Sequence, residues 1–155
     1  EVNQGEAGEL LLKGPMVTPG YWDNPEATAK TIVEGWFHTG DMVRQDQEGY
    51  LYVVDRIKNM FISGGENVYP AEVERVLLQH EGVSEAAVIG IPHERWGEVG
   101  KAFVVKKESL TENALIDHCK AHLAKFKVPK VVVFVEELPK NDAGKIDRKA
   151  LSKME

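Results

Sequence analysis

Short apolar runs separated by polar turns fill the first 55 or so positions of the 155-residue chain. The runs at residues 8–13, 37–43 and 50–55 predict strands, and a polar turn joins the last two. Asn24 followed by Pro25 is typical of a helix start, because Asn caps free N–H groups and proline fits the first helical position. We therefore expect one short helix, over residues 25–33, inside an otherwise β-rich segment.

The pattern changes after residue 55, where apolar runs alternate with longer amphipathic stretches. Strands are expected at residues 57–62, 83–91, 102–105 and 131–135, a glycine-bearing loop at 63–67, and helices from Pro70 to about Gly82, at 111–126 and at 147–154. This order suits a small sheet covered by helices.

The two patterns of apolar and polar residues predict an α+β chain with two parts. Residues 1–55 form a β-rich segment too short to fold alone, residues 56–58 form a hinge, and residues 59–155 form a small domain with a short central β-sheet flanked by helices. The sequence lacks an initiator Met and a signal-peptide pattern at its start, so we expect it to be cut from a longer chain.

Composition narrows the functional classes. The chain is 43% hydrophobic and 28% charged, which is typical of a globular protein, and no apolar run is long enough to span a bilayer. The net charge of -6 argues against a nucleic-acid partner, which needs a basic surface. The single Cys119 excludes an internal disulfide and fits a reducing, cytoplasmic location.

Gly144-Lys145 invites a phosphate-loop interpretation, which the neighbouring residues exclude. That motif needs a glycine five residues before its second glycine and a Ser or Thr after the lysine, and Pro139 and Ile146 stand there instead. Alone, Lys145 is a solvated surface lysine. Its polar, glycine-bearing loop at residues 139–145 nevertheless suits the delivery of an ammonium group into a site.

Two other candidate chemistries are weak. His118 and His122 lie four residues apart on a predicted helix, a spacing that can hold a metal, but no third ligand stands at a matching place. Cys119 falls in the apolar pattern of the same helix, where a free cysteine behaves as a small hydrophobe. We therefore expect surface histidines, a core cysteine and no metal site.

Two polar motifs have a structural and a functional interpretation. Asp41, after Gly40, is either a turn residue or a carboxylate that accepts hydrogen bonds from the vicinal hydroxyls of a ribose. Gly64 and Gly65 precede a predicted helix, and permit either an awkward turn or the close approach of a ligand to the backbone.

In order, these blocks resemble the adenylate-forming enzymes, a superfamily of acyl-CoA synthetases, peptide-synthetase adenylation domains and beetle luciferases. The resemblance covers nearly the whole chain, and several motifs in the right order are far more specific than one short match. It is carried by Gly8-Glu9-Leu10, Gly20-Tyr21-Trp22, Gly35 to Asp41, Gly49 to Tyr52, the hinge block from Asp55 to Glu74, and the final block from Pro139 to Arg148.

The resemblance implies a two-step reaction and a division of labour. A carboxylate attacks the α-phosphorus of ATP, giving an acyl-adenylate and pyrophosphate, and the thiol of CoA then releases AMP. Residues 1–55 would end a large N-terminal domain that holds the acyl pocket and most of the site for ATP and Mg²⁺. The C-terminal domain would be a mobile lid that rotates between the steps, and the chain alone would be inactive.

Site residues follow from the same resemblance, position by position. Asp41 matches the carboxylate that holds the ribose hydroxyls, and Arg56 matches an arginine near the nucleotide. Lys58 stands at the hinge position. Gly64 and Gly65 match glycines that line the pantetheine path of CoA. Lys145 matches the lysine that bridges the carboxylate and the α-phosphate during adenylation, where a positioned cation stabilises developing charge.

Two further segments resemble parts of the CoA nucleotide site of some ligases. They are His93 to Glu98 and Phe126 to Lys130. Trp96 and Phe126 are candidates to pack on adenine, and Lys130 is a candidate to meet a phosphate. Val128 departs from the pattern, because some relatives have arginine there, so a phosphate contact at that position is lost.

The implied function is an ATP-dependent acyl-CoA synthetase, an acid–thiol ligase of fatty acid metabolism. Its partners would be its own N-terminal domain, a carboxylic acid, ATP and CoA. One alternative is an aryl or amino-acid adenylating domain that loads a carrier protein. Another is a non-catalytic docking lid. The acyl chain is not predicted, because the pocket lies outside these residues.

Overall fold

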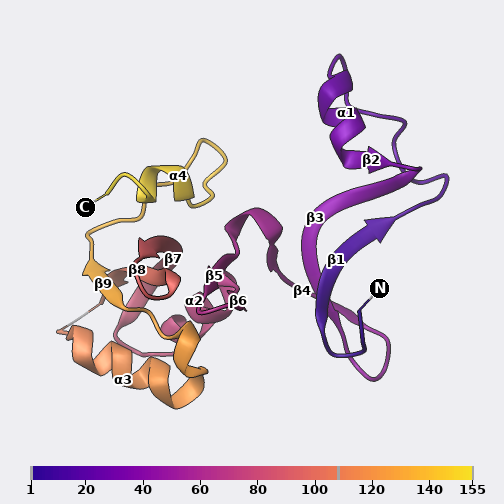
Figure 1. The fold of residues 1–155 in the computed structure, drawn as a ribbon. Helices are drawn as coiled ribbons and strands as arrows, with labels where there is room; N and C mark the ends of the chain where they lie inside the picture. Colours follow the sequence, from indigo (N-terminus) through magenta and orange to yellow (C-terminus); the bar gives the residue numbers. More distant parts are fainter. Residues whose placement is uncertain (1, 108, 155) are drawn as a thin grey trace. The chain divides into compact units, whose positions relative to one another are not determined.

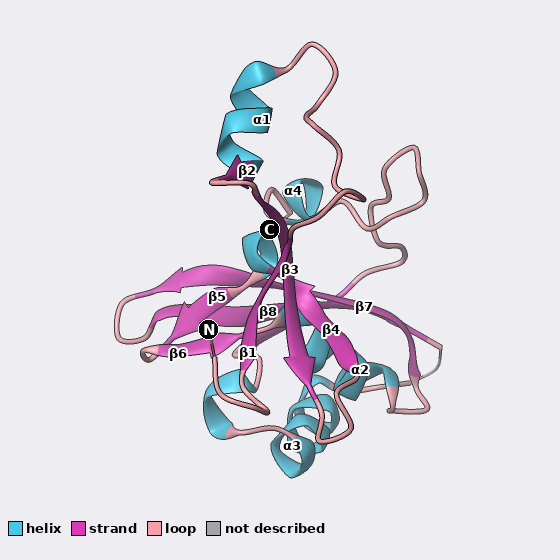
Figure 2. Cartoon of the chain, turned by 90° about the vertical axis from the view of Figure 1, so that its right-hand side faces the viewer, coloured by secondary structure: helices cyan, strands magenta, loops and turns pink. Residues whose placement is uncertain are grey.

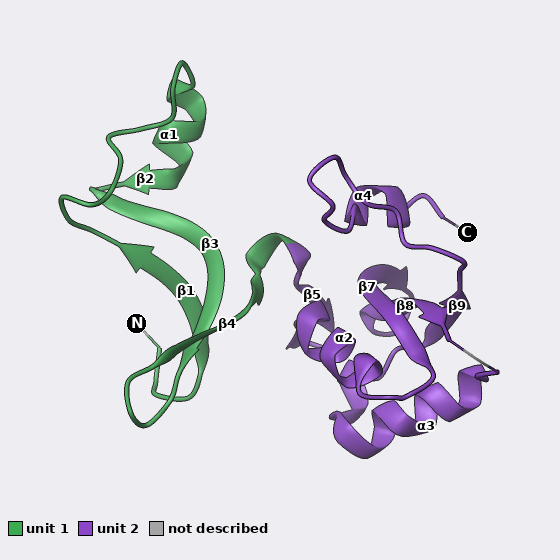
Figure 3. Cartoon of the chain, turned by 180° about the vertical axis from the view of Figure 1, so that it is seen from behind, with its two compact units in different colours: residues 1–58 green, residues 59–155 purple. Residues whose placement is uncertain are grey.

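The computed structural model describes residues 2–107 and 109–154. The chain divides into two compact units, residues 1–58 and residues 59–155, which are coloured separately in Figure 3. We refer to them as unit 1 and unit 2, and describe each by itself.

Unit 1 is a small antiparallel sheet with one short helix (Figure 1). Its described elements are β1 (Ala7–Leu12), α1 (Pro25–Thr31), β2 (Ile32–Val33), β3 (Trp36–Gln45) and β4 (Leu51–Arg56). The long strand β3 pairs with β1, β2 and β4. Among the described residues of unit 1 only Val43 and Asp55 are buried. The sheet therefore encloses almost no core of its own.

Local chemistry sets both ends of α1. The Asn24 side chain accepts the N–H of Ala27 at 3.0 Å, and proline occupies the first helical turn, as the sequence predicted. The helix ends at Thr31, earlier than expected. Ile32 and Val33 are β-branched and pair with β3 as a short strand instead.

The β3–β4 turn is organised by Asp46. Its carboxylate accepts the N–H groups of Glu48 and Tyr50, both at 2.9 Å. Desolvation acts to raise the pKa of Asp46, but these amide hydrogen bonds, led by that of Tyr50, hold the pKa below its ordinary value. The ionised carboxylate thus closes the turn.

Unit 2 is a five-stranded sheet with helices on both faces (Figure 2). The 3-10 turn η1 (Ile57–Asn59) spans the boundary between the two units. The described elements of unit 2 are β5 (Phe61–Ser63), β6 (Glu66–Val68), α2 (Pro70–Leu78), β7 (Val83–His93), β8 (Gly97–Lys106), α3 (Glu112–His122), η2 (Lys125–Lys127), β9 (Val131–Phe134) and α4 (Arg148–Leu151). The order is β6-β5-β8-β7, and β9 lies parallel to β8.

Alternate residues of β7 and β8 face two different cores. Val88 and Val104 belong to the cluster shared with α2 and α3, which lie below the sheet in Figure 2. Ala87 and Phe103 belong to a second, smaller cluster, which includes Leu151 of α4 on the other side. The sheet is therefore covered on one face by two helices and on the other by the C-terminal segment.

Cys119 is part of the larger core. It is fully buried on α3, and burial raises the pKa of its thiol to about 11. The thiol therefore stays protonated at neutral pH, when a nucleophile would need to be a thiolate.

The predicted α+β class is confirmed, and the described helices include none long and apolar enough to span a bilayer. The expected strand at 57–62 is wrong in part, because residues 57–59 form the 3-10 turn η1. The expected loop at 63–67 is also wrong in part. Gly64 and Gly65 have φ of +62° and +88°, which two-residue hairpin turns require, so the chain doubles back as β6.

The second helix, expected over 111–126, ends at His122. Its start is as predicted, since the Thr111 hydroxyl accepts the N–H of Ala114 at 3.3 Å. Past Leu123 the chain makes the 3-10 turn η2 and enters Val128-Pro129, where the residue before proline disfavours helix. The final helix is also shorter than expected and spans Arg148–Leu151, with Asp147 as its cap.

We predict that Gly90→Ala destabilises the chain. A Cβ on Gly90 would lie 2.5 Å from Cβ and 2.7 Å from Cγ of the buried Phe61. Because Phe61 sits on the short strand β5, it cannot withdraw without moving that strand. The overpacking should lower the free energy of unfolding by about 1–3 kcal/mol, measured by urea denaturation.

Gly82→Ala is the matched control. Gly82 is buried whereas Gly90 is half-buried, yet a Cβ on Gly82 meets neighbours no closer than 3.4 Å. Equal destabilisation of the two variants would contradict the steric account.

We predict that Gly64→Ala displaces Trp96, whereas Gly65→Ala does not. Both glycines have positive φ, so each alanine should cost about 1–2 kcal/mol of backbone strain. Only at Gly64 would the Cβ collide with the indole, 2.9 Å from Cε3, since nothing lies within 4 Å at Gly65. The Trp96 indole N–H resonance, followed by NMR, should shift in the first variant and stay in place in the second. Equal shifts would refute the collision.

Candidate functional site

Asp41 and Arg56 form an ion pair across two strands of unit 1. They stand directly opposite each other on β3 and β4, and Nη1 of Arg56 lies 2.6 Å from Oδ1 of Asp41. The arginine side chain is 49% exposed and the aspartate 28%. The structure therefore brings together the two residues that the sequence analysis assigned to the nucleotide, and leaves both accessible to a ligand.

A bulge in β3 sets the direction of Asp41. The register between β1 and β3 shifts between Glu9 and Leu11, and Gly40 within the bulge has φ of +71°. The Thr39 hydroxyl donates to the carbonyl of Leu10 at 2.8 Å and accepts the N–H of Asp41 at 3.1 Å. The backbone of Asp41 is thereby tied to β1.

Glu9 completes the bulge from the neighbouring strand. One carboxylate oxygen accepts the N–H of Gly40 at 3.1 Å, and the other lies 3.0 Å from Nδ1 of His38. The sequence analysis named Glu9 only as part of a motif and assigned it no contact. Its contact with Gly40 on the neighbouring strand could not be predicted before the bulge was known.

Lys145 lies in a tight loop of unit 2. The Asn141 side chain accepts the N–H groups of Ala143 and Lys145, both at 3.0 Å, and the Asn141 N–H donates to the Lys145 carbonyl at 2.8 Å. Gly144 supplies the positive φ, +73°, that the turn needs. The backbone of Lys145 is therefore fixed, while its side chain is exposed.

The two glycines and Trp96 meet at one end of the unit 2 sheet. Gly64 donates its N–H to the Trp96 carbonyl at 2.9 Å, and Ser63 pairs with Gly97. The Arg95 guanidinium carbon lies 4.9 Å from the Trp96 ring centroid, and the indole is 40% exposed. This end of the sheet thus offers backbone without side chains next to an aromatic ring and a cation.

Phe126 and Lys130 are placed by the segment between α3 and β9. Phe126 is half-buried and packs against the larger core, with the Lys127 ammonium 5.7 Å from its ring centroid. Lys130 has an exposed side chain and donates its N–H to the carbonyl of Gly100 near the start of β8. Phe126 therefore has less free ring surface for a ligand than Trp96.

Lys58 lies in η1, an exposed residue at the boundary of the two units. Asp41 and Arg56 belong to unit 1, whereas Lys145 and the candidate CoA residues belong to unit 2. The structure of each unit thus assembles its own set of candidates.

The described residues include no group of three His, Cys, Asp or Glu side chains placed to hold a metal ion. His118 and His122 make backbone contacts instead, His118 Nε2 to the Val76 carbonyl and His122 Nδ1 to the His118 carbonyl, both at 2.9 Å.

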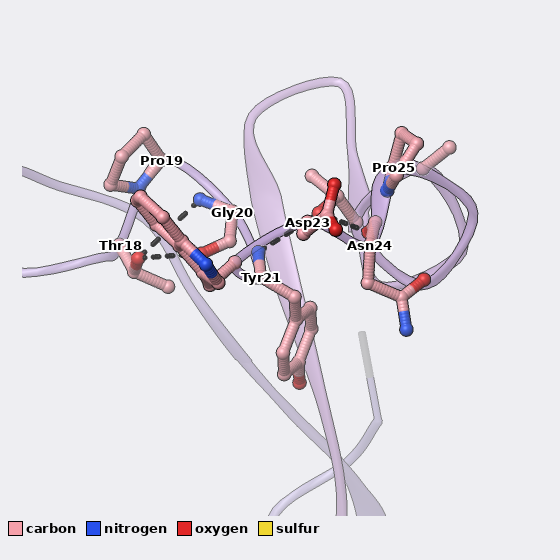
Figure 4. A pocket seen from close by; sticks show the side chains of 10 residues that line it. Thr18, Pro19, Gly20, Tyr21, Asp23, Asn24 and Pro25 are labelled. Carbon is pink, nitrogen blue, oxygen red and sulfur yellow. Dashed lines mark hydrogen bonds between the residues drawn. The ribbon is translucent and has the colours of Figure 1, made fainter.

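A hollow of about 680 Å³ lies in unit 1, and none of the predicted site residues lines it (Figure 4). The loop from Thr18 to Pro25 and the start of α1 line it. The Thr28 hydroxyl ties this loop to the helix by accepting the N–H of Tyr21 at 2.9 Å. Trp22 on the loop is 98% exposed, so the hollow is open to solvent.

Comparison with known proteins identifies the fold family. Residues 72–145 match the family model of the AMP-binding enzyme C-terminal domain. A long-chain-fatty-acid–CoA ligase of Salmonella typhimurium is 53% identical over 152 residues, which are 97% of this chain and 27% of the relative. A 2-succinylbenzoate–CoA ligase of a Geobacillus species is 54% identical over 151 residues, 96% of this chain and 31% of the relative.

A solved structure agrees with these relatives. The o-succinylbenzoate CoA synthetase of Bacillus subtilis, in complex with an acyl-adenylate intermediate, matches with a TM-score of 0.93 and 41% identity, over 99% of this chain and 32% of that one. The chain thus spans about 30% of the length of the proteins it matches. Residues 72–145 therefore belong to the family of the AMP-binding enzyme C-terminal domain.

Proposed function

We propose that the chain is the C-terminal part of an ATP-dependent acyl-CoA synthetase. The observation that carries the proposal is the exposed Lys145 on a conformationally fixed loop of an AMP-binding C-terminal domain. The relatives described above are CoA ligases by name, which supports CoA as the acceptor over a carrier protein. A docking lid without catalytic function would not need a cation held in this way.

The reaction has two displacements. An oxygen of the substrate carboxylate bonds to the α-phosphorus of ATP, and the bond to the bridging oxygen breaks, so that pyrophosphate leaves. The CoA sulfur then attacks the acyl carbon of the adenylate, its proton is lost, and AMP leaves. The bound acyl-adenylate of the Bacillus relative is the intermediate that joins these two steps.

Lys145 acts in the first displacement. Negative charge builds on the non-bridging oxygens of the α-phosphate and persists on the incoming carboxylate, so a placed ammonium group lowers the energy of the transition state. The Asn141 contacts fix the backbone from which this side chain extends, which reduces the entropy lost when it reaches the site.

Asp41 and Arg56 hold the nucleotide. The aspartate can accept the two vicinal ribose hydroxyls, since a carboxylate has two oxygens and several lone pairs. Arg56 orients that carboxylate through the 2.6 Å contact and supplies positive charge for the phosphate side. The β3 bulge holds the backbone of Asp41 in place when the nucleotide enters.

Gly64, Gly65, Trp96 and Lys130 are proposed to contact CoA. The glycine turn lets the narrow pantetheine arm pass close to the backbone. Trp96 and its neighbour Arg95 offer an aromatic face and a cation at the same end of the sheet. Phe126 contributes less, because its ring is partly used by the core.

The remaining parts of the enzyme lie in the N-terminal domain that relatives carry, to which we assign unit 1. The nearly coreless sheet of unit 1 supports this assignment, because an isolated sheet with so little buried surface would not hold together. ATP binds with Mg²⁺ mostly in that domain, and we assign the ion no ligand in this chain. We further propose an enzyme of fatty acid metabolism, following the name of the Salmonella relative, and a cytoplasmic location, following the single cysteine.

In the full-length enzyme, Lys145→Ala should slow acyl-adenylate formation by about 10²–10³-fold, the usual effect of removing a positioned charge. Thioester formation from synthetic acyl-adenylate and CoA should change little, because the lysine serves only the first transition state. ATP–pyrophosphate exchange and single-turnover thioester assays separate the two steps.

Lys149→Ala is the matched control, since Lys149 is an exposed lysine four residues away on α4. Lys140 is less suitable, because it pairs with Glu85 at 2.8 Å. If Lys145→Ala and Lys149→Ala behave alike, or if both half-reactions fall together, the role of Lys145 is wrong.

We also predict that Lys58 is the pivot between the units. Hinges are a few boundary residues that absorb large φ/ψ changes, and Lys58→Pro would fix φ near about -65°. One half-reaction should then lose far more rate than the other, because a single orientation of the lid is trapped. Lys58→Ala removes the charge but leaves φ free, and should retain both half-reactions. Equal losses for Lys58→Pro would count against a pivot.

A further inference from the structure

The free edge of β7 is covered by two charged side chains from distant parts of unit 2. β7 ends the order β6-β5-β8-β7, so one of its edges has no strand partner, and its backbone polar groups there need other ones. At Val88 these partners are Glu74 of α2 and Arg148 of α4. The glutamate accepts the Val88 N–H at 2.8 Å, and the arginine donates to the Val88 carbonyl at 2.6 Å.

Glu74 and Arg148 also bind each other. Nη1 of Arg148 lies 2.8 Å from Oε1 of Glu74, and Nη2 donates to Oε2 at 3.1 Å, so the pair is bidentate. The Arg148 side chain is only 24% exposed and the Glu74 side chain only 13%. We call this arrangement of Glu74, Arg148 and the Val88 backbone the β7 clasp.

The clasp fixes one end of the loop that carries Lys145. Arg148 follows Lys145 by three residues, and between them Asp147 donates its N–H to the Pro139 carbonyl at 2.8 Å. At the other end of the loop, Lys140 pairs with Glu85, which is also on β7. Both ends of the loop are thus attached to β7, at Glu85 and at Val88.

The two attachments differ in strength. The Lys140–Glu85 pair is more than a third exposed on both sides, and such surface pairs contribute little because water and salt screen them. The clasp is mostly buried, bidentate and linked to two backbone groups of a central residue. It therefore sets the position of the loop.

Stability of the same region has a separate source. Leu151 and Leu138 are buried in the smaller core, and Ile146 packs against it. Buried ion pairs contribute less to net stability than hydrophobic contacts of similar volume, because their desolvation offsets their attraction. Hydrophobic burial thus attaches the C-terminal segment to the sheet, whereas the clasp sets the orientation of the loop that carries Lys145.

We propose that Glu74 and Arg148 are positioning residues for Lys145, through which they act on the adenylation step alone. The proposal rests on the function proposed for Lys145. A small displacement of a catalytic group costs up to about 10²-fold in rate, so the clasp is large enough to control the step without touching substrate.

The test uses the full-length enzyme with Glu74→Gln/Arg148→Met, which removes both charges and leaves neither one buried alone. Adenylate formation should fall by about 10- to 10²-fold, the cost of a misplaced group. Thioester formation from synthetic acyl-adenylate should fall by less than about threefold, since Lys145 takes no part in it. Arg148→Lys, which keeps the charge, should restore part of the lost rate, and Lys149→Met on the same helix should behave as wild type.

The decisive measurement repeats the double substitution in a Lys145→Ala background. A residue that acts only through Lys145 has nothing left to position, so no further loss of adenylation is expected. A purely structural role would lower the rate by the same factor in both backgrounds and would overturn the proposal. So would equal loss in both half-reactions, or no loss at all.

Two outcomes separate this proposal from the function beneath it. If Lys145→Ala alone leaves adenylation intact, the proposed function itself fails. If Lys145→Ala slows it while the clasp variant does not, only the clasp fails. Should the double variant not fold, as judged by its thermal transition, Arg148→Lys and Glu74→Gln decide singly, and wild-type adenylation in both would overturn the proposal.

Discussion

The long antiparallel pair of β7 and β8 is the constraint on which unit 2 depends. Its register runs from Val83 opposite Lys106 to His93 opposite Gly97, longer than any other pairing of the unit. One face packs against α2 and α3 and the other against the C-terminal segment. Because side chains alternate between these faces, a shift of one residue would exchange the two cores, and this fixes the register strongly.

Most candidate residues of unit 2 take their places from this pair. Trp96 stands in the turn that joins the two strands, beside the Gly64–Gly65 turn. Lys130 is held to the start of β8 through Gly100. Lys145 is held to the free edge of β7 through Arg148. One hairpin thus positions both the residues proposed to contact CoA, at its tip, and the lysine proposed for adenylation, at its edge.

Much of this was readable from the sequence. An apolar run predicted most of β7, and Asn24, Thr111 and Pro70 marked helix starts that the structure has. The motif blocks gave the family, which the matches confirm. The glycine turn was harder to assign, because both an irregular loop and a tight hairpin need positive φ, and only pairing between β5 and β6 decides between them.

Contacts between distant polar residues were out of reach of the sequence. Glu74 and Arg148 each look like solvated charges on a helix surface, and nothing local shows that they meet at the unpaired edge of β7. Glu9 was equally hidden, because its contact with Gly40 depends on a bulge that shifts the strand register. Periodicity identifies which face a residue occupies, whereas such contacts follow from tertiary packing that periodicity does not contain.

Two arginine–carboxylate pairs among the described residues differ in burial, and this difference determines which pair a ligand can rearrange. Arg56 and Asp41 are joined by one short contact and are substantially exposed, so water already competes for them, and breaking the pair costs about 0–1 kcal/mol. A nucleotide bound there, as proposed, can therefore rearrange this side-chain contact. Arg148 and Glu74 are mostly buried and satisfy backbone groups as well, so removing one partner costs about 3–5 kcal/mol. A ligand contact at the surface would not offset a free-energy cost of that size. The same two functional groups thus form an exposed, adaptable pair in unit 1 and a buried, fixed pair in unit 2.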